Sequence, residues 1–251
     1  GLTELRQLTD ELFATEGWHV KHQLDGIHRT WKVLSANWQL VGKTLGRFKQ
    51  DSEYALKVWG GARANPEWDT FLDLVDLALH NYIASVVALA DHTSKVADRV
   101  LQGESHSLYR GEYNRRFRED PRSSFVRGLR NYLLHRALPI TSGSFHFEKD
   151  GPFSHAIMLS VEALADDDGW NPKALDFMDE AGEGLDIYET LLAHYNDTRS
   201  FQKRFEALVF EANKEVIAET NEIADRRNAL IPPVRKELEA TTHDGVVVPH
   251  I

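Results

Sequence analysis

The chain of 251 residues contains no cysteine. This absence excludes a disulfide framework, a thiolate metal site and a cysteine nucleophile, and it is typical of a protein from a reducing compartment. The sequence also lacks an uninterrupted apolar run of about 18 residues and a basic, apolar leader, so we expect neither a membrane-spanning helix nor a secretory signal. Together these absences predict a cytoplasmic protein with no membrane partner.

Positive charge is scarce, because 39 acidic residues outnumber 29 lysines and arginines and leave a net charge of −10. Such a balance argues against indiscriminate coating of nucleic acid. The segment 110–136 is the exception, since it holds eight arginines and three acids. Guanidinium groups bind phosphate through parallel hydrogen bonds, so this arginine island suits an RNA backbone. The candidate RNA-binding residues are Arg115, Arg116, Arg118 and Arg122. The alternative is a solvated, arginine-rich loop.

Apolar residues recur every three or four positions through most of the chain, which is typical of amphipathic helices. We therefore expect a mainly α protein, a single helical-bundle domain over 1–251. Two long helices are predicted, over 66–101 and 185–230. Pro232-Pro233 is expected to end the second of them, because proline removes a backbone donor and clashes with the preceding turn. A short tail would then cover 232–251.

The helical period is replaced by a strand-like pattern within 140–165. Apolar and polar residues alternate there on both sides of Asp150-Gly151, which predicts a β-hairpin inserted between helices. Two shorter features are also expected. A helix over 2–15 should end at Gly17, since glycine commonly follows a helix C-terminus. The polar segment 102–120 is predicted to be a loop.

The segment 121–139 has the strongest pattern, because Pro121 suits a helix start and Pro139 would stop the helix. Its apolar face is formed by Phe125, Val126, Leu129, Tyr132 and Leu133. The opposite face is formed by Arg127, Asn131 and His135, which are four residues apart and therefore stack. Leu134 and Leu138 lie on that polar side, where a solvated helix would not place them. We therefore expect another helix or a second copy of the chain to cover it.

Arg130, Asn131 and His135 read Arg-Asn-x-x-x-His, which resembles the signature of the HEPN superfamily. The likeness covers about a dozen residues. It implies a four- or five-helix bundle that dimerises and cleaves RNA without a metal or other cofactor, as a toxin or defence effector does. It also implies a protein antitoxin as a partner. In one subset of the family a tyrosine stands two residues after the histidine. Ala137 occupies that position here, which departs from the subset and its particular antitoxin.

Carried over from the family, His135 would transfer protons, Arg130 would contact phosphate and Asn131 would position the scissile group or the imidazole. The residue types suit this chemistry. In metal-free cleavage the 2′-hydroxyl attacks its own phosphate, which needs a base, an acid and positive charge. One motif supplies a single histidine, so a symmetric dimer would supply both proton roles. Asp91 and Arg127 are candidates for a supporting shell, with Asp91 orienting His135.

Two other functions stay open. The first is a non-catalytic, HEPN-like helical protein that binds a nucleotide or a protein partner. The second is a metal-dependent helical-bundle enzyme, suggested by His19, His22 and His28, since imidazole is the commonest metal ligand. We do not expect this metal site, because no Glu-x-x-His lies on a clear core-facing stripe. Gly42-Lys43-Thr44 is not a phosphate loop, because no strand precedes it and the upstream glycine is missing.

Overall fold

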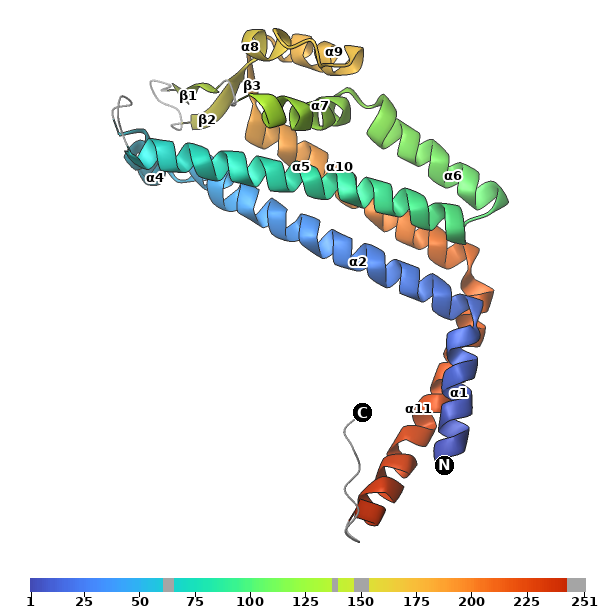
Figure 1. The fold of residues 1–251 in the computed structure, drawn as a ribbon. Helices are drawn as coiled ribbons and strands as arrows, with labels where there is room; N and C mark the ends of the chain where they lie inside the picture. Colours follow the sequence, from blue (N-terminus) through green and yellow to red (C-terminus); the bar gives the residue numbers. More distant parts are fainter. Residues whose placement is uncertain (61–65, 137–139, 147–153, 243–251) are drawn as a thin grey trace.

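The core is built on α5 (Pro66–Val100), the longest helix of the computed structural model, which describes residues 1–60, 66–136, 140–146 and 154–242. Its 35 residues make a rod of about 52 Å. α2 (Glu16–Val41) runs along one side of α5, α7 (Pro121–His135) lies on another side, and α10 (Ile187–Ala212) passes behind it (Figure 1). The prediction of a mainly α bundle is confirmed.

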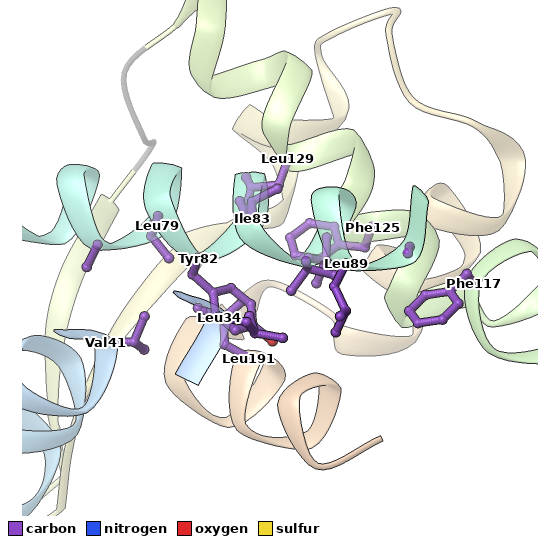
Figure 2. Packing of buried hydrophobic residues seen from close by; sticks show 14 of the residues in the cluster. Leu34, Val41, Leu79, Tyr82, Ile83, Leu89, Phe117, Phe125, Leu129 and Leu191 are labelled. Carbon is purple, nitrogen blue, oxygen red and sulfur yellow. The ribbon is translucent and has the colours of Figure 1, made fainter. Parts of the chain in front are cut away.

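The side chains that hold these helices together lie on the inner stripe of α5 and on the faces turned toward it. Figure 2 shows Leu129 of α7 over Ile83 and Phe125 over Leu89, so α7 runs antiparallel to α5. Leu34 and Leu191 meet Tyr82 from the other side. All of these side chains are buried, and burial of a large apolar side chain stabilises a fold by about 1.5–3 kcal/mol.

The described residues include one helix, α5, that is long and apolar enough to cross a membrane, with a mean hydropathy of 1.4 over its best window. The search for uninterrupted apolar runs misses it, because isolated polar residues divide the sequence. Only 44% of that window is buried in the fold. A core helix of a bundle passes the same criterion, so the observation is weak evidence for a membrane. Part of the apolar surface of α5, including Leu74 and Leu77, is exposed in the fold.

The predicted loop 102–120 is wrong. That segment forms α6 (Gly103–Tyr113), which continues into a π-helix, η2 (Asn114–Glu119). Gly103 has a φ of +54°, which turns the chain back after α5. Tyr109, Tyr113 and Phe117 are four residues apart and pack on the aromatic rings of α10, such as Phe201. This aromatic spacing is a helical signal that the polar composition of the segment concealed.

The region after α2 is also more helical than its glycines suggest. A π-helix, η1 (Gly42–Gly46), is followed by α3 (Arg47–Gln50) and α4 (Ser52–Trp59). Gly60 ends α4 with a left-handed backbone. These short helices carry Phe48 and Ala55 into the core, so burial outweighs the low helix propensity of glycine.

The predicted hairpin is confirmed, although it belongs to a larger sheet. β1 (Ile140–His146) pairs antiparallel with β2 (Ser154–Ser160). β2 also pairs with β3 (Gly184–Asp186), which gives a three-stranded sheet in the order β1-β2-β3. The chain between β2 and β3 forms α8 (Val161–Ala165) and α9 (Pro172–Ala181). The strand prediction therefore extends a few residues too far, into α8.

The first and last helices form an arm that projects from the bundle (Figure 1). α1 (Leu2–Ala14) packs along α11 (Lys214–Thr242), and Leu8, Leu12 and Ile223 form a small core separate from the main one. The predicted long helix 185–230 is therefore broken. The break falls at Asn213, whose amide donates to the carbonyl oxygens of Val100 (3.1 Å) and Val209 (2.8 Å).

Two predicted helix ends in this arm are wrong. Gly17 does not end a helix but lies in the first turn of α2, where Thr15 is the N-cap and accepts from the Trp18 amide. A side chain at Gly17 would collide with the backbone of α11 at Val216, so close packing requires glycine here. Pro232-Pro233 lies inside α11. Both prolines are exposed, so water can bond the freed carbonyls, and the helix continues beyond them to buried Val234 and on to Thr242.

Candidate functional site

The motif residues Arg130, Asn131 and His135 lie together on the exposed face of α7. Asp120 starts this helix, because its carboxylate accepts from the Ser123 amide at 2.7 Å, and Pro121 occupies the first turn. The prediction of the helix and of its two faces is confirmed. The predicted cover over the polar face is absent in the described part of a single chain. Leu138 and Ala137 lie outside the described residues.

The buried face of α7 is clamped by the segment that carries α8 and α9. Trp170 stacks on Phe125 with ring centroids 5.4 Å apart and planes 6° apart. Its indole nitrogen donates to the Leu164 carbonyl at 2.6 Å. Gly128 allows the ring to approach, since a side chain at that position would collide with the indole. The clamp fixes the rotation of α7, and therefore the direction in which the motif points.

The functional groups of the motif have no bonding partner among the described residues. Among residues 1–60, 66–136, 140–146 and 154–242, no hydrogen bond or ion pair is formed by the side chains of Arg130, Asn131 or His135. Leu134 lies between them on the surface and is 59% exposed. Leu134 and the unbonded groups of Arg130, Asn131 and His135 are thus all accessible to another molecule.

The arginine island has a different environment. Arg116 bonds to Glu112 (3.1 Å) and to Asp197 (2.9 Å), and Arg122 bonds to the other oxygen of Asp197 (3.1 Å). Arg115 pairs with Glu112 at 2.6 Å. Burial acts to raise the pKa of Glu112, but the hydrogen bonds from Arg115 and Arg116 outweigh it and the net shift is downward. Three of the four candidate RNA-binding arginines are therefore ion-paired within the chain, although their three guanidinium groups share only two carboxylates.

Arg118 is the fourth candidate, and it forms no ion pair with the described residues. Its guanidinium lies over the ring of Tyr113 at 5.8 Å, and it is exposed. Arg136, at the end of α7, pairs with Asp167 of the α8–α9 segment at 3.2 Å. Of the motif arginine and the four candidate RNA-binding arginines, Arg130 and Arg118 are therefore the two that form no ion pair with the described residues.

Asp91 does not lie beside His135. It lines a cavity of about 90 Å³ together with Arg127, Ser123 and His194. His135 is eight residues beyond Arg127, or about 12 Å along the helix, so Asp91 cannot orient its ring. Arg127 is held by a hydrogen bond of 2.5 Å to the Phe117 carbonyl. The two proposed supporting residues thus line the same cavity near the middle of α7, about two turns before the motif histidine.

A buried polar pair, which sequence inspection misses, lies behind this cavity. His194 of α10 is 3% exposed, and its Nδ1 is 2.9 Å from the hydroxyl of Tyr82. Burial lowers the pKa of His194 to about 4, so the ring is neutral at physiological pH. Burial also raises the pKa of Tyr82. Both residues fall on helical core positions, and a histidine at such a position gives no distinct signal in a sequence.

The histidines of the metal hypothesis are engaged in other contacts. His22 stacks on Trp18 with planes 5° apart, and His19 meets the edge of the same ring. His28 pairs with Glu206 at 3.1 Å. Within the part of the chain that the structure describes, no three histidine or acidic side chains converge as metal ligands.

Comparison with protein-family models, with curated proteins and with solved structures gave no match. The fold and the site therefore define a class only, a mainly α helical bundle with an exposed Arg-Asn-x-x-x-His motif. The likeness to HEPN proteins stays a prediction that rests on the motif.

Proposed function

We propose that the protein is a HEPN-type, metal-independent endoribonuclease whose site is formed by Arg130, Asn131 and His135. One observation carries the proposal: the three side chains are exposed on a single rigid helix face and are free of bonds to the described residues. Structural arginines in the same segment are bonded to acids instead. A preorganised helix presenting unbonded groups is what a site for an external substrate requires.

The proposed reaction is attack of the 2′-hydroxyl on the adjacent phosphate, which releases the 5′-oxygen and leaves a 2′,3′-cyclic phosphate. His135 transfers a proton, because an imidazole can act as base or acid. Arg130 stabilises the charge on the phosphorane, since guanidinium stays protonated. Asn131 positions the scissile group. Arg118 and Arg130 contact the RNA backbone. Arg116 ties η2 to α10, Arg122 ties α7 to α10, and Arg115 pairs with Glu112 of α6.

A second function is favoured by the ion-paired arginines. Because Arg115, Arg116 and Arg122 are ion-paired within the chain, fewer guanidinium groups are free to contact RNA than the sequence predicts. A non-catalytic protein that binds a protein partner through Leu134 and the motif is the corresponding hypothesis. An antitoxin would be one such partner for a toxin or defence effector in the cytoplasm.

The test is incubation of the purified protein with mixed RNA in the presence of EDTA. The nuclease proposal predicts cleavage in chelator and products that end in a 2′,3′-cyclic phosphate. His135→Ala should lower the cleavage rate by about 10²–10⁴-fold without altering the melting temperature. A metal enzyme would stop in EDTA, whereas a binding protein would show no turnover with either variant. Inertness of the wild type on several RNAs, as a confirmed dimer, would contradict the nuclease proposal.

A further inference from the structure

The small cavity that contains Asp91 and Arg127 lies where α5, α6, η2, α7 and α10 meet, and its volume is about 90 Å³. Its walls are mainly buried and apolar, and they include Ile83, Val86, Ala90, Phe117 and Val126. Asp91 of α5 and Arg127 of α7 are the exposed members of the lining, so they stand at its mouth. The cavity is therefore an apolar chamber that opens to solvent between an acid and a base.

The acid and the base at the mouth form no ion pair with each other or with another residue that the structure describes. Among the described residues, Arg127 donates to the Phe117 carbonyl alone, at 2.5 Å. A neighbouring cavity of about 400 Å³ shows the contrast, because its Arg116 and Asp197 are bonded to each other at 2.9 Å. Two opposite charges that border one chamber and stay apart are complementary to a molecule that carries both signs.

Two buried polar side chains in the lining also have groups without a partner. Ser123 is 7% exposed, and its hydroxyl forms no hydrogen bond with a described residue. His194 is 3% exposed and uses Nδ1 in its contact with Tyr82, whereas its other ring nitrogen has no partner in the described part of the chain. Buried polar groups are nearly always bonded to protein or to water. These two groups therefore mark positions at which a molecule inside the cavity forms hydrogen bonds.

The polar groups of the cavity match the parts of one kind of small molecule. Ser123 and Arg127 are four residues apart on α7, so they stack on one face. A hydroxyl and a guanidinium both donate hydrogen bonds, which suits a carboxylate. Asp91 comes from the other helix and accepts hydrogen bonds, which suits an ammonium group. An α-amino acid carries these two groups on one carbon atom, and its side chain is a third substituent that can enter the apolar chamber.

The volume and the walls of the cavity limit that side chain. A water molecule takes up about 30 Å³ of liquid, and a cavity of about 150 Å³ accommodates benzene. The observed volume of about 90 Å³ is therefore enough for a short aliphatic group and too small for an aromatic ring. A charged side chain is excluded, because the apolar walls would not replace its hydration.

We propose that this cavity binds a free α-amino acid with a short aliphatic side chain, about the size of valine. The ammonium group binds Asp91, the carboxylate binds Arg127 and Ser123, and the side chain displaces water from the apolar walls. Burial lowers the pKa of His194 to about 4, so this ring adds a hydrogen-bonding group without a charge that would compete for the carboxylate. The proposal is independent of the nuclease function, because none of these residues belongs to the motif.

Titration of the isotope-labelled protein with L-valine, followed by the shifts of its backbone amide signals in NMR, tests the ligand class. L-valine should bind with saturable shifts of amides that border the cavity, and L-phenylalanine should not bind there. L-valinamide lacks the carboxylate and 2-hydroxy-3-methylbutanoate lacks the ammonium group, so each should bind at least about tenfold more weakly. Absence of L-valine binding up to millimolar concentrations would overturn the proposal. Equally tight binding of either analogue, or of L-phenylalanine, would also overturn it.

Variants at the mouth test the site itself in the same titration. Asp91→Asn and Arg127→Gln should each raise the dissociation constant for L-valine by about tenfold, because each removes one charge from an ionic hydrogen bond. Asp225→Asn and Arg226→Gln, at exposed positions on α11, are the matched controls and should leave the constant unchanged. If Arg127→Gln lowers the melting temperature, Asp91→Asn decides, since that side chain bonds to no described residue. Wild-type affinity in a folded Asp91→Asn variant would overturn the proposed site.

Discussion

The two ends of α7 differ in what their side chains do. At the N-terminal end, Arg122 is bonded to Asp197, and the neighbouring cavity is lined by Arg127 and buried His194. At the C-terminal end, Arg130 and His135 are exposed and form no bond with the described residues. The same residue types are thus structural at one end and available at the other. Residue type alone therefore does not mark a site; the bonds that each residue already makes must be known.

The largest expected effect is on the rate of RNA cleavage, and it distinguishes exposed His135 from buried His194. If His135 transfers protons, His135→Ala should lower the rate of RNA cleavage by about 10²–10⁴-fold, because that is the usual contribution of one acid–base group. Its melting temperature should stay unchanged, since the side chain packs against nothing buried. Single-turnover cleavage in chelator and thermal melts of the same preparation provide the measurement. A loss of activity accompanied by unfolding would place His135 with the structural residues instead.

His194 should show the opposite behaviour. Its pKa is lowered by burial to about 4, below the value of about 6.5 in an unfolded chain. The unfolded state therefore binds the proton first as the pH falls, so the stabilisation present above pH ~6.5 is lost toward pH ~4. The expected loss is about 3 kcal/mol of unfolding free energy.

Urea melts at pH 7, 5.5 and 4.5 measure this loss, with His194→Gln as the comparison. Glutamine keeps a hydrogen-bonding group for Tyr82 but does not titrate in this range. The unfolding free energy of His194→Gln should therefore fall less steeply with decreasing pH than that of the wild type. Equal slopes for both proteins would contradict the assignment. Burial also lowers the pKa of His92 and of His155, and the wild type and His194→Gln share the resulting dependence of stability on pH.

A smaller effect concerns the ion network beside α7. Arg116→Gln should reduce the unfolding free energy by about 1–2 kcal/mol, because the bonds to Glu112 and Asp197 are partly shielded from water. Added salt should reduce the difference in unfolding free energy between the wild type and Arg116→Gln. RNA affinity should change little, and a large fall in RNA binding at unchanged stability would show that this arginine is not structural.

The smallest effect is on the salt dependence of RNA binding. Arg118→Gln should reduce the slope of log affinity against log salt by roughly 0.7–0.9, since one phosphate contact is lost. Arg115→Gln should leave the slope close to that of the wild type, because Arg115 is paired with Glu112. Fluorescence titrations at several salt concentrations measure both slopes. Identical reductions would mean that the ion pairs open when RNA binds.

The sequence predicts those elements whose local signals agree with their packing. α5 and α7 begin at prolines, and the β1–β2 hairpin follows its turn signal. The errors occur where tertiary contact overrides a local rule. Gly17 permits close packing and does not end a helix, and α11 continues beyond two prolines to buried Val234. α6 and η2 were not predicted, because their three inward-facing aromatic residues lie among polar residues in the sequence.

The features of the site also divide into those that local sequence signals predict and those that depend on tertiary contacts. The motif helix and its exposed face can be predicted from spacing, because both depend on contacts a few residues apart. The pairing of Arg116 and Arg122 with Asp197 joins positions about 80 residues apart and has no local signal. For the same reason the sequence placed Asp91 near His135, although the antiparallel packing of α5 and α7 places it beside Arg127.

The most direct test compares two arginines on one helix, Arg130→Ala and Arg122→Ala, for RNA cleavage and for unfolding free energy. Cleavage by Arg130→Ala should fall by about 10²–10³-fold at unchanged stability, because a donor to the phosphorane is removed. Arg122→Ala should lose stability and keep a cleavage rate close to that of the wild type. Equal effects of the two variants on cleavage, or a stable and fully active Arg130→Ala, would contradict the assignment of function to the exposed end of α7.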